Sequence, residues 1–509
     1  MAAPADKLAE SLAVLKDLQE RGAVAIRTSD LSRTHRQRLL ATGFIREVMK
    51  GWYVPSRPDE PTGESTSWYT LFWEFCATYL SERFGDEWCL SPEQSISLHT
   101  GEWTVPKQLL ARSPKGGNKP TDLLFGTSIF DIRLKLPSPA DVTVLGGMRV
   151  YNLPAALIAC APSHFPAQAS TLRAALAMVP DASDVLGRLL DGGHSKVAAR
   201  LAGAFRNIGR DQIADNIVGT MQSAGYTVNE TDPFADKSPL PFSPRDTSPY
   251  VNRMRMSWAA MRRDILTNFP AAPGITKDAT AYMKQIEQSY VADAYNSLSI
   301  EGYKVSAELI ERVRSGNWNA DSIKGDKDHR DALAARGYFQ AFEIVKRSIE
   351  KVLRGENAGA VADKDHATWY RELFGPSIAA GILKPSDLAG YRHGPVYIRR
   401  SKHVPPRHAA VRELMPTFFE QLAQEAEPAV RVVLGHFMFV YIHPYFDGNG
   451  RMGRFMMNVM MASGGYPWTI IPVESRADYM AALEAASADQ NIKPFTQFIG
   501  ELIKQKKTS

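Results

Sequence analysis

Two predominantly apolar segments near the C-terminal end of the chain enclose a short polar run that is rich in glycine. The first runs from Val430 to Ile442 and the second from Phe455 to Met461. Their composition predicts two buried helices. Between them lies the active-site loop candidate His443–Arg454, with the sequence HPYFDGNGRMGR. A polar loop held between buried helices departs from simple packing, and such departures are typical of functional sites. The fold must therefore form around this loop.

The second half of the loop has the composition of an anion site. At the start of a helix, backbone N–H groups have no acceptor within the helix, and here they would be those of Gly448, Asn449 and Gly450. The helix dipole also favours phosphate at this position. Arg451 and Arg454 are three residues apart and share a helix face, so their guanidinium groups can bind phosphate oxygens together. This part of the loop predicts a phosphate-binding site.

The first half of the loop offers a base and a metal ligand. His443 titrates near neutral pH and can accept a hydroxyl proton. Asp447 is a carboxylate of the kind that holds Mg²⁺ together with phosphates and water. A capped interhelical loop with incidental charges would account for the glycines and Asp447, but not for His443-Pro444 and two arginines. The combination predicts transfer of a phosphoryl or nucleotidyl group to a hydroxyl.

This run resembles the Fic (filamentation-induced-by-cAMP) motif, His-x-Phe-x-Asp/Glu-Gly-Asn-Gly-Arg-x-x-Arg. The one departure is Tyr445, which stands where phenylalanine is usual and should keep the role of a core anchor. The resemblance implies an all-α Fic-type domain that transfers AMP from ATP to a Ser, Thr or Tyr hydroxyl of a target protein. The intact Gly-Asn-Gly-Arg sequence matters here, because family branches that phosphorylate proteins alter it.

The resemblance also assigns roles within the loop. It implies that His443 is the catalytic base and that Asp447 holds Mg²⁺. It implies that Arg454 binds the γ-phosphate of ATP. The α- and β-phosphates would be bound by the run Gly448, Asn449, Gly450 and Arg451.

Two further segments fit the same family. Residues 393–406 contain Val396-Tyr397-Ile398 between turn residues, which predicts a β-hairpin. It resembles the family's flap, which pairs with the main chain of the target. Tyr479 and Leu483 lie one helical turn apart and match the part of the family that packs around adenine; plain core residues are an equally good interpretation.

A segment upstream resembles the inhibitory helix Ser/Thr-x-x-x-Glu-Gly/Asn of the family. Ser297 and Glu301 are four residues apart in a predicted helix of about residues 285–302, and Gly302 ends it. The resemblance implies that Glu301 pairs with Arg454 and blocks the γ-phosphate within the same chain. A solvent-facing Glu301 is the plain alternative, and a Glu301 that positions water to remove AMP is another.

Length and composition favour several domains. A chain of 509 residues is too long for one core. We predict a winged-helix-like domain over residues 1–58 and a mixed α/β domain over 59–226. A proline-rich linker follows over 227–250, and the Fic-type domain covers 251–509. The fold class is therefore multidomain, with an N-terminal winged helix and α/β part followed by an all-α domain with a hairpin flap.

The N-terminal part adds a second functional hypothesis. Its order is helix, basic helix and hairpin, and the basic helix carries Arg33, His35, Arg36 and Arg38. Winged helices of this layout often read DNA, although a protein-docking domain is the alternative. Residues 1–225 resemble AbiEi-type antitoxins, with Gly51-Trp52-Tyr53-Val54 at the wing. The chain could thus be a DNA-binding regulator that uses its Fic-type domain as a sensor.

The cysteines, the net charge and the hydropathy indicate the location of the protein and its partners. Cys76, Cys89 and Cys160 have no metal-binding spacing, which indicates buried reduced thiols and a cytoplasmic protein. The net charge of +5 is mild and does not by itself imply nucleic acid. No window is apolar enough for a membrane span. The expected partners are ATP, Mg²⁺ and a protein substrate, which could be the chain itself, with DNA as a further candidate.

Overall fold

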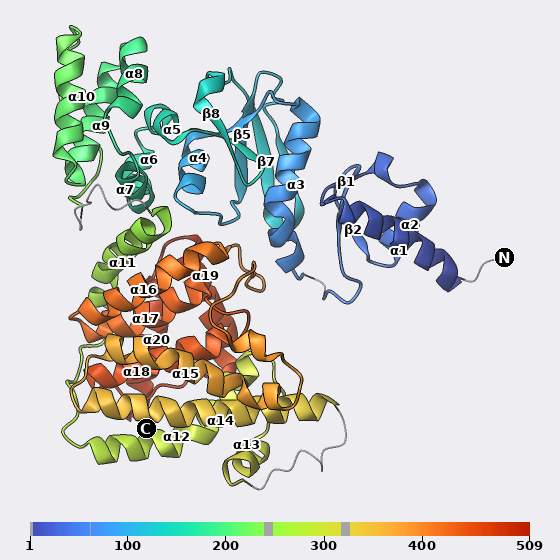
Figure 1. Cartoon of the computed structure of the whole chain (residues 1–509), viewed down its shortest axis with the longest axis vertical. Helices are drawn as coiled ribbons and strands as arrows, with labels where there is room; N and C mark the ends of the chain where they lie inside the picture. The colour runs from blue at the N-terminus through green and yellow to red at the C-terminus, as the bar shows by residue number, and fades with distance from the viewer. Residues whose placement is uncertain (1–3, 62, 239–247, 317–325, 509) are drawn as a thin grey trace. The chain divides into compact units, whose positions relative to one another are not determined.

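The structure is a computed structural model that describes residues 4–61, 63–238, 248–316 and 326–508. It divides into two compact units, whose elements are labelled in Figure 1. The first unit comprises Met1–Arg253 and the short segment Tyr397–Val404; the second comprises Met254–Val396 and Pro405–Ser509. Residues 239–247 of the predicted linker lie outside the described residues.

The N-terminal part of the first unit has the predicted order of helices and hairpin. Helices α1 (Pro4–Glu20) and α2 (Arg33–Ala41) are followed by strands β2 (Ile45–Met49) and β3 (Trp52–Pro55). Strand β1 (Ile26–Arg27) pairs with β3, which gives an antiparallel sheet in the order β1-β3-β2. Helices and sheet share an apolar cluster of Leu15, Ile26, Leu31, Leu39, Ile45 and Tyr53. The assignment as a winged helix stays a prediction.

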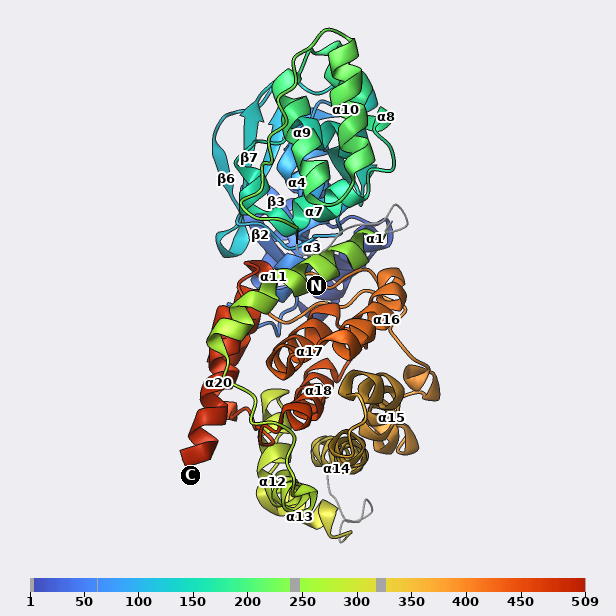
Figure 2. The ribbon, with the colours of Figure 1, turned by 90° about the vertical axis from the view of Figure 1, so that its left-hand side faces the viewer.

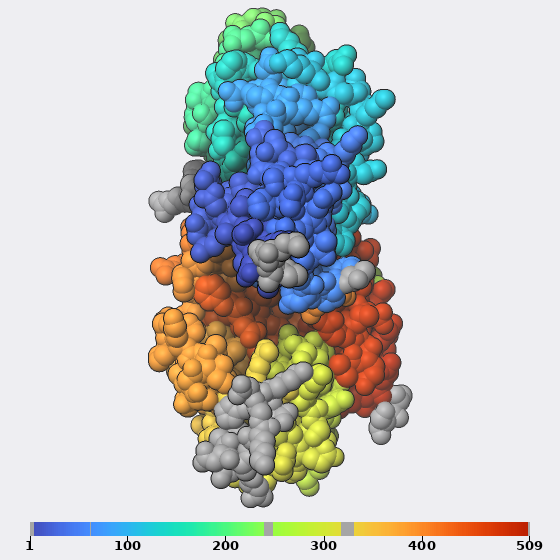
Figure 3. Space-filling view, turned by 90° about the vertical axis from the view of Figure 1, so that its right-hand side faces the viewer, coloured from blue at the N-terminus to red at the C-terminus, as the bar shows by residue number. Residues whose placement is uncertain are grey.

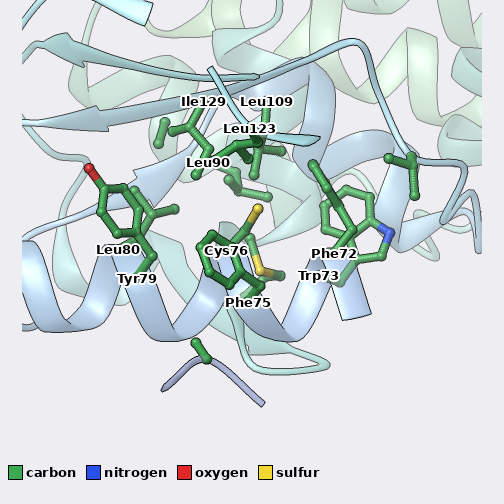
Figure 4. Packing of buried hydrophobic residues seen from close by; sticks show 14 of the residues in the cluster. Phe72, Trp73, Phe75, Cys76, Tyr79, Leu80, Leu90, Leu109, Leu123 and Ile129 are labelled. Atoms are coloured by element: carbon green, nitrogen blue, oxygen red, sulfur yellow. The ribbon is translucent and has the colours of Figure 1, made fainter. Parts of the chain in front are cut away.

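An aromatic helix and a small sheet form the core of the α/β part. Helix α3 (Thr66–Phe84) packs Phe72, Phe75 and Cys76 against Leu109 and Ile129 of the sheet (Figure 4). The sheet has the order β4 (Cys89–Leu90), β5 (Gln108–Ser113), β7 (Ser128–Arg133) and β6 (Pro120–Asp122), with β5 and β7 parallel. All three cysteines are buried and unpaired, as predicted.

Two elements of this part are shorter than their sequence patterns predict. The pattern of residues 123–132 predicts a strand, but the strand β7 begins only at Ser128, because Phe125 and Gly126 adopt φ values of 52° and 69° and turn the chain. The pattern of residues 191–206 predicts a helix, which is present as α9 (Ser195–Asn207), whereas Asp191 is the last residue of the preceding helix α8 (Ser183–Asp191). Gly193, with φ of 59°, lies between these two helices.

Further elements complete the first unit. They are α4 (Pro92–His99), η2 (Leu124–Gly126), β8 (Val142–Leu145), β9 (Met148–Tyr151), α5 (Leu153–Ala159), α6 (His164–Ala167), α7 (Ala169–Ala177) and α10 (Asp211–Ser223). Strands β8 and β9 pair antiparallel, where the sequence pattern predicts two strand-like runs at 142–144 and 148–151. Helix α10 was not predicted, and it lies beside α9 in Figures 1 and 2.

The described part of the second unit is built from helices. They are α11 (Pro249–Asn268), α12 (Ala279–Ile300), α13 (Ala307–Arg314), α14 (Asp326–Leu353), α15 (Ala358–Ala379), α16 (His408–Gln424), α17 (Pro428–Ile442), α18 (Asn449–Gly464), α19 (Arg476–Ala488) and α20 (Lys493–Thr508). Helix α15 was not predicted; Pro376 within it and Gly359 near its start weaken the helical pattern.

Helix α18 is the centre of this unit. Helices α12, α14, α15 and α17 all contact it, and Figure 2 shows them around it. Most side chains of α17 and α18 are buried, which confirms the prediction of two buried helices around the loop. Segments far apart in the sequence, coloured yellow, orange and red, share one face of the unit in Figure 3.

The predicted β-hairpin over 393–406 is wrong, because this described segment forms no strand. Pro395, Pro405 and Pro406 lack an N–H group, so they cannot donate to a ladder. Other main-chain groups of this segment form hydrogen bonds within the first unit: Arg400 N donates to Thr66 Oγ1 at 2.9 Å, and Lys402 O accepts from Val105 N at 2.9 Å.

Among the described helices, none is long and apolar enough to cross a membrane.

Candidate active site

The loop between α17 and α18 begins and ends with left-handed residues. His443 follows the last residue of α17 and has a φ of 54°, which is uncommon for a residue with a side chain. Gly448, with φ of 80°, precedes the first residue of α18. The two turns bring the loop back on itself, so His443 and the N-terminus of α18 belong to one short, well-defined segment.

The imidazole of His443 is set up as a proton acceptor. Its Nδ1 lies 3.1 Å from the carbonyl oxygen of Val440, which can only accept, so Nδ1 carries the proton. The lone pair is therefore on Nε2. Burial lowers the pKa of His443 to about 4, with the charge of Arg392 acting in the same direction, so the ring is neutral at neutral pH.

Arg392 holds the main chain on which His443 lies, and the sequence analysis missed it. Its Nε donates to His443 O at 2.8 Å, and its Nη2 donates to Ile442 O at 3.4 Å. Nη1 donates to Gly394 O at 3.0 Å, and Nη2 also donates to Pro406 O. The buried guanidinium thus joins the end of α17 to Gly394 and Pro406 in the segment between α15 and α16. Its position next to Tyr391 gave no signal in the sequence.

Tyr445 and Asn449 fix the shape of the loop. The Tyr445 ring is buried and stacks on Tyr370 with centroids 3.7 Å apart, so the expected core anchor is present. The Asn449 side chain accepts from Tyr445 N at 3.0 Å and donates to Tyr445 O at 2.8 Å. Because the Asn449 side chain is occupied in this way, only its main chain can contribute to an anion site.

Two buried arginines lie at the N-terminus of α18. Arg451 is 1% exposed and Arg454 is 4% exposed. Arg451 Nε and Arg454 Nη1 have no hydrogen-bond partner among the described residues. Buried donors of a charged group are costly to leave unmatched. These donors, beside the main chain of Gly450 in the first turn of α18, indicate an anion-binding site.

Asp447 extends from the loop toward solvent. Its side chain is 65% exposed, Oδ1 accepts from Gly448 N at 2.5 Å, and Oδ2 lies 3.4 Å from Arg451 Nη2. No group of three or more His, Cys, Asp or Glu side chains in the described ranges could hold a metal ion. One exposed carboxylate beside an anion site nevertheless fits Mg²⁺, which takes one or two protein carboxylates and completes its shell with phosphates and water.

The end of α12 meets Arg454. Ser297 Oγ accepts from Arg454 Nε at 2.8 Å, and Ser297 O accepts from Nη2 at 3.0 Å. Glu301 Oε1 accepts from Nη2 at 2.7 Å. A side-chain carbon added at Gly450 would overlap the Glu301 carboxylate, so this carboxylate lies directly over the glycine at the start of α18. Ser297 and Glu301 thus both contact Arg454.

The charges at this contact reinforce one another. Burial works to raise the pKa of Glu301, but the guanidinium groups of Arg454 and Arg451 outweigh it and hold that pKa below its usual range. Burial works to lower the pKa of Arg454, and Glu301 overcomes it, so the pKa of Arg454 is raised. Both groups are therefore charged at neutral pH, and a carboxylate occupies donors that could otherwise bind a phosphate.

The other predicted site residues differ in their distance from this contact. Tyr479 is buried close to Arg454, whose charge acts against the effect of burial on the pKa of the Tyr479 hydroxyl. It is 1% exposed, and its hydroxyl lies 2.7 Å from Nε2 of the buried His436. Val396 belongs to the second unit, whereas Tyr397 and Ile398 belong to the first, and Tyr397 is 41% exposed. The structure therefore brings together the loop and the end of α12, but leaves the roles of these other residues as predictions.

The basic side chains of α2 are mostly engaged inside the N-terminal part. His35 Nδ1 lies 2.9 Å from Ser11 Oγ, and Arg38 Nη1 donates to the same oxygen at 2.7 Å. Arg36 Nη1 donates to Thr28 O at 3.1 Å. These bonds give three of the four basic residues a structural role within the domain, which weakens the argument for a DNA surface.

Comparison with known proteins identifies the domain around the loop. Residues 366–461 match the Fic/DOC family, and this range contains Arg392 and the whole loop. The chain carries a Fic domain. The end of α12 and Tyr479 lie outside the matched range, so the comparison does not bear on Ser297, Glu301, Gly302 or Tyr479.

Curated proteins that are similar to this chain carry the name protein adenylyltransferase Fic. The protein of Drosophila grimshawi is 26% identical over 272 residues, which is 52% of this chain and 52% of that protein. The protein of Drosophila willistoni is 27% identical over 235 residues, 45% of this chain and 43% of the relative. The chain thus spans about half the length of the curated relatives it matches. A solved structure of Fic-1 from C. elegans is similar with a TM-score of 0.38 and 17% identity, covering 63% of this chain and 90% of that one.

Proposed function

We propose that this chain is a protein adenylyltransferase that moves AMP from ATP to a Ser, Thr or Tyr hydroxyl of a target protein. The observation that carries the proposal is the pair of buried arginines with unmatched donors at the N-terminus of α18, next to a neutral His443. The relatives that share the Fic domain are named for this activity, which supports the proposal.

In the proposed reaction His443 is the general base. Its Nε2 takes the proton of the target hydroxyl, and the resulting oxygen attacks the α-phosphorus of ATP. A new oxygen–phosphorus bond forms, the bond between the α-phosphorus and the bridging oxygen breaks, and pyrophosphate leaves. Arg451 and the main chain of Gly448, Asn449 and Gly450 bind the α- and β-phosphates, and Arg454 binds the γ-phosphate.

Asp447 is the proposed ligand of Mg²⁺. Its exposed carboxylate lies beside the anion site and leaves most of the metal's coordination shell to phosphates and water. The ion would neutralise the charge of the triphosphate.

We also propose that the enzyme is autoinhibited by the inhibitory segment Ser297–Gly302. Glu301 occupies the Arg454 donor that the γ-phosphate needs, and its carboxylate lies over Gly450. Two anions cannot share this place, so ATP in the productive position requires Glu301 to move away. Removal of AMP by a water that Glu301 positions remains a related prediction.

The target-docking role of Val396, Tyr397 and Ile398 and the adenine contact of Tyr479 are retained as parts of this proposal. For the three-residue segment, main chain that belongs to no strand, rather than a preformed hairpin, would receive the target. A cytoplasmic location rests on the three free thiols.

Labelled nucleotides test the proposed reaction. Purified Glu301→Gly protein is incubated with ATP carrying ³²P at the α position, or in parallel at the γ position, with Mg²⁺ and cell lysate as acceptor. We expect protein-bound label from α-labelled ATP only, and none from the Glu301→Gly/His443→Ala protein. Label from the γ position would instead indicate phosphorylation, and absence of label from both would contradict the proposal.

DNA binding by the N-terminal part, as in AbiEi-type antitoxins, stays an alternative prediction. A gel shift with the upstream DNA of the gene, repeated at raised salt, tests it. Specific binding should be strongly weakened by salt, because phosphate contacts release counterions. Arg33→Gln, on the exposed face of α2, should weaken the shift if this helix contacts DNA.

A further inference from the structure

The guanidinium of Arg451 is held mainly by two aromatic rings. Its central carbon lies 5.1 Å from the centroid of Tyr303 and 5.0 Å from that of Phe374. Among the described residues it donates one long hydrogen bond, from Nη2 to Asp447 Oδ2 at 3.4 Å, and its Nε has no partner. A buried cation that is held by ring faces keeps the N–H groups at its edge available for an anion.

The turn at the end of α12 places Tyr303 on Arg451. Gly302 has a φ of 89°, Gly302 N donates to Ser299 O at 3.0 Å, and Tyr303 N donates to Leu298 O at 3.1 Å. This pair of bonds forms a Schellman motif, which reverses the chain directly after the helix. Glu301 and Tyr303 therefore flank one fixed turn, with Glu301 on Arg454 and Tyr303 on Arg451.

Phe374 is the second ring and comes from α15. Its ring packs against Gly448, where an added side-chain carbon would overlap it. Phe374 is buried, whereas Tyr303 is partly exposed and is also approached by Arg330, whose guanidinium carbon lies 5.4 Å from the ring centroid. Tyr303 can therefore be changed with less risk to folding than Phe374.

We propose that Tyr303 is a positioning residue for the phosphates of ATP. Together with Phe374 it fixes the plane of the Arg451 guanidinium, so that the edge of this group meets the phosphates. The inference rests on the proposed function, because it takes Arg451 as a phosphate ligand. An arginine whose guanidinium is already stacked on a ring loses less side-chain freedom when it binds phosphate than an arginine that can rotate freely. Loss of the Tyr303 ring should therefore weaken ATP binding.

The test measures ATP affinity by calorimetry in the full chain carrying Glu301→Gly. We expect Tyr303→Leu to raise the dissociation constant for ATP about three- to tenfold, which is the size of a partly desolvated cation–π contact. Tyr303→Phe should restore the affinity, since it keeps the ring. Tyr295→Leu is the matched control, because it removes an exposed tyrosine from α12, the helix that precedes Tyr303, and should change nothing.

A double-mutant cycle separates positioning from a structural role. With Arg451→Gln already present, Tyr303→Leu should weaken ATP binding no further, because its effect passes through Arg451. An unchanged ATP affinity in Tyr303→Leu would overturn the inference. So would an equal loss with and without the Arg451 side chain, or a failure of Tyr303→Phe to restore binding.

The same protein distinguishes this inference from the proposed function. If Glu301→Gly binds ATP and Tyr303→Leu weakens it as expected, the inference holds even where no AMP is transferred, and the proposed reaction alone fails. If AMP is transferred but Tyr303→Leu has no effect, the inference alone fails. If Glu301→Gly binds no ATP, both fail.

Discussion

At the scale of single residues, Arg454 is the decisive side chain of the proposed mechanism, because Glu301 and the γ-phosphate of ATP would compete for it. Its Nη2 is bound by Glu301 Oε1 at 2.7 Å and by Ser297 O, and its Nη1 faces Gly450 without a partner among the described residues. The Nη2 atom of this guanidinium is thus bound by residues of the same chain, whereas its Nη1 atom is not. In the proposed mechanism, the occupancy of Arg454 decides whether AMP is transferred.

Removal of the internal anion should activate the protein. We expect Glu301→Gly to raise AMP transfer and self-modification about tenfold or more, since a bias of about 1.4 kcal/mol already corresponds to a factor of ten. Glu301→Gln, which loses the charge but keeps the size, should give an intermediate rate. The measurement is incorporation of α-labelled ATP over time. Glu308→Gln, an exposed glutamate on α13, is the control; equal, low labelling by wild type and Glu301→Gly would contradict autoinhibition.

The pH dependence of the rate reports on His443. Burial lowers the pKa of His443 to about 4 from its ordinary value near 6.5, so the ring stays neutral down to about pH 4. In the Glu301→Gly protein, kcat/KM should therefore be flat between pH 6 and 8 with respect to this group and should fall only near pH 4. His443→Ala should lower the rate at least a hundredfold at every pH. A decline centred on pH 6.5 that depends on His443 would show an unshifted imidazole.

At the scale of secondary-structure elements, the end of α17 is tied to the segment between α15 and α16 by one side chain. The last carbonyls of α17 cannot be satisfied within the helix, and Arg392 donates to those of Ile442 and His443. The same guanidinium binds Gly394 O and Pro406 O. The left-handed conformation of His443 is therefore supported from outside its own loop.

Loss of this side chain should affect both stability and rate. We expect Arg392→Met to lower the free energy of unfolding by about 2–3 kcal/mol, because buried carbonyls lose charged donors. AMP transfer in the Glu301→Gly background should fall more than ATP affinity does, since the base and not the phosphate site is displaced. Denaturant titration and paired rate and binding measurements check this. Arg412→Met, at an exposed position of α16, should leave all three unchanged.

At the scale of the whole molecule, the chain passes from one unit to the other twice in a short stretch. Met254–Val396 belongs to the second unit, Tyr397–Val404 belongs to the first, and the chain returns to the second at Pro405. Within the first unit the crossing segment is held by Glu64, whose Oε2 accepts from Arg399 Nε at 2.7 Å and Arg400 Nε at 3.3 Å. A segment with an expected role in target docking is therefore anchored to the N-terminal half of the chain.

Glu64 should control the mobility of the crossing segment. Burial works to raise the pKa of Glu64, but its bonds to Thr66 and Arg399 lower it to about 2. The interaction is therefore present above about pH 4.5 and is lost as the pH falls toward 2. We expect Glu64→Gln to raise hydrogen exchange of residues 398–404 about tenfold at neutral pH, measured by mass spectrometry. Glu47→Gln, at an exposed position of β2, is the control, and unchanged exchange would contradict this anchoring.

The sequence by itself determined the two helices around His443–Arg454, the residues of the loop and the shared helix face of Ser297 and Glu301. These follow from local rules: helical spacing, glycine at the start and end of helices, and residue types that suit phosphate. The pairing of Glu301 with Arg454 was expected from the resemblance to the Fic family, and the structure contains this contact. The resemblance to the Fic motif also implied that Tyr445 is a core anchor, and its side chain is buried.

Only the tertiary structure decided how distant segments meet. The contacts of Arg392 with the end of α17, of Tyr303 and Phe374 with Arg451, and of Glu64 with Arg399 join residues far apart in the chain. Their partners are carbonyl oxygens, ring faces and a buried carboxylate, which carry no periodic pattern. The same reason explains the wrong hairpin at 393–406, where bonds to Thr66 and Val105 replaced local pairing.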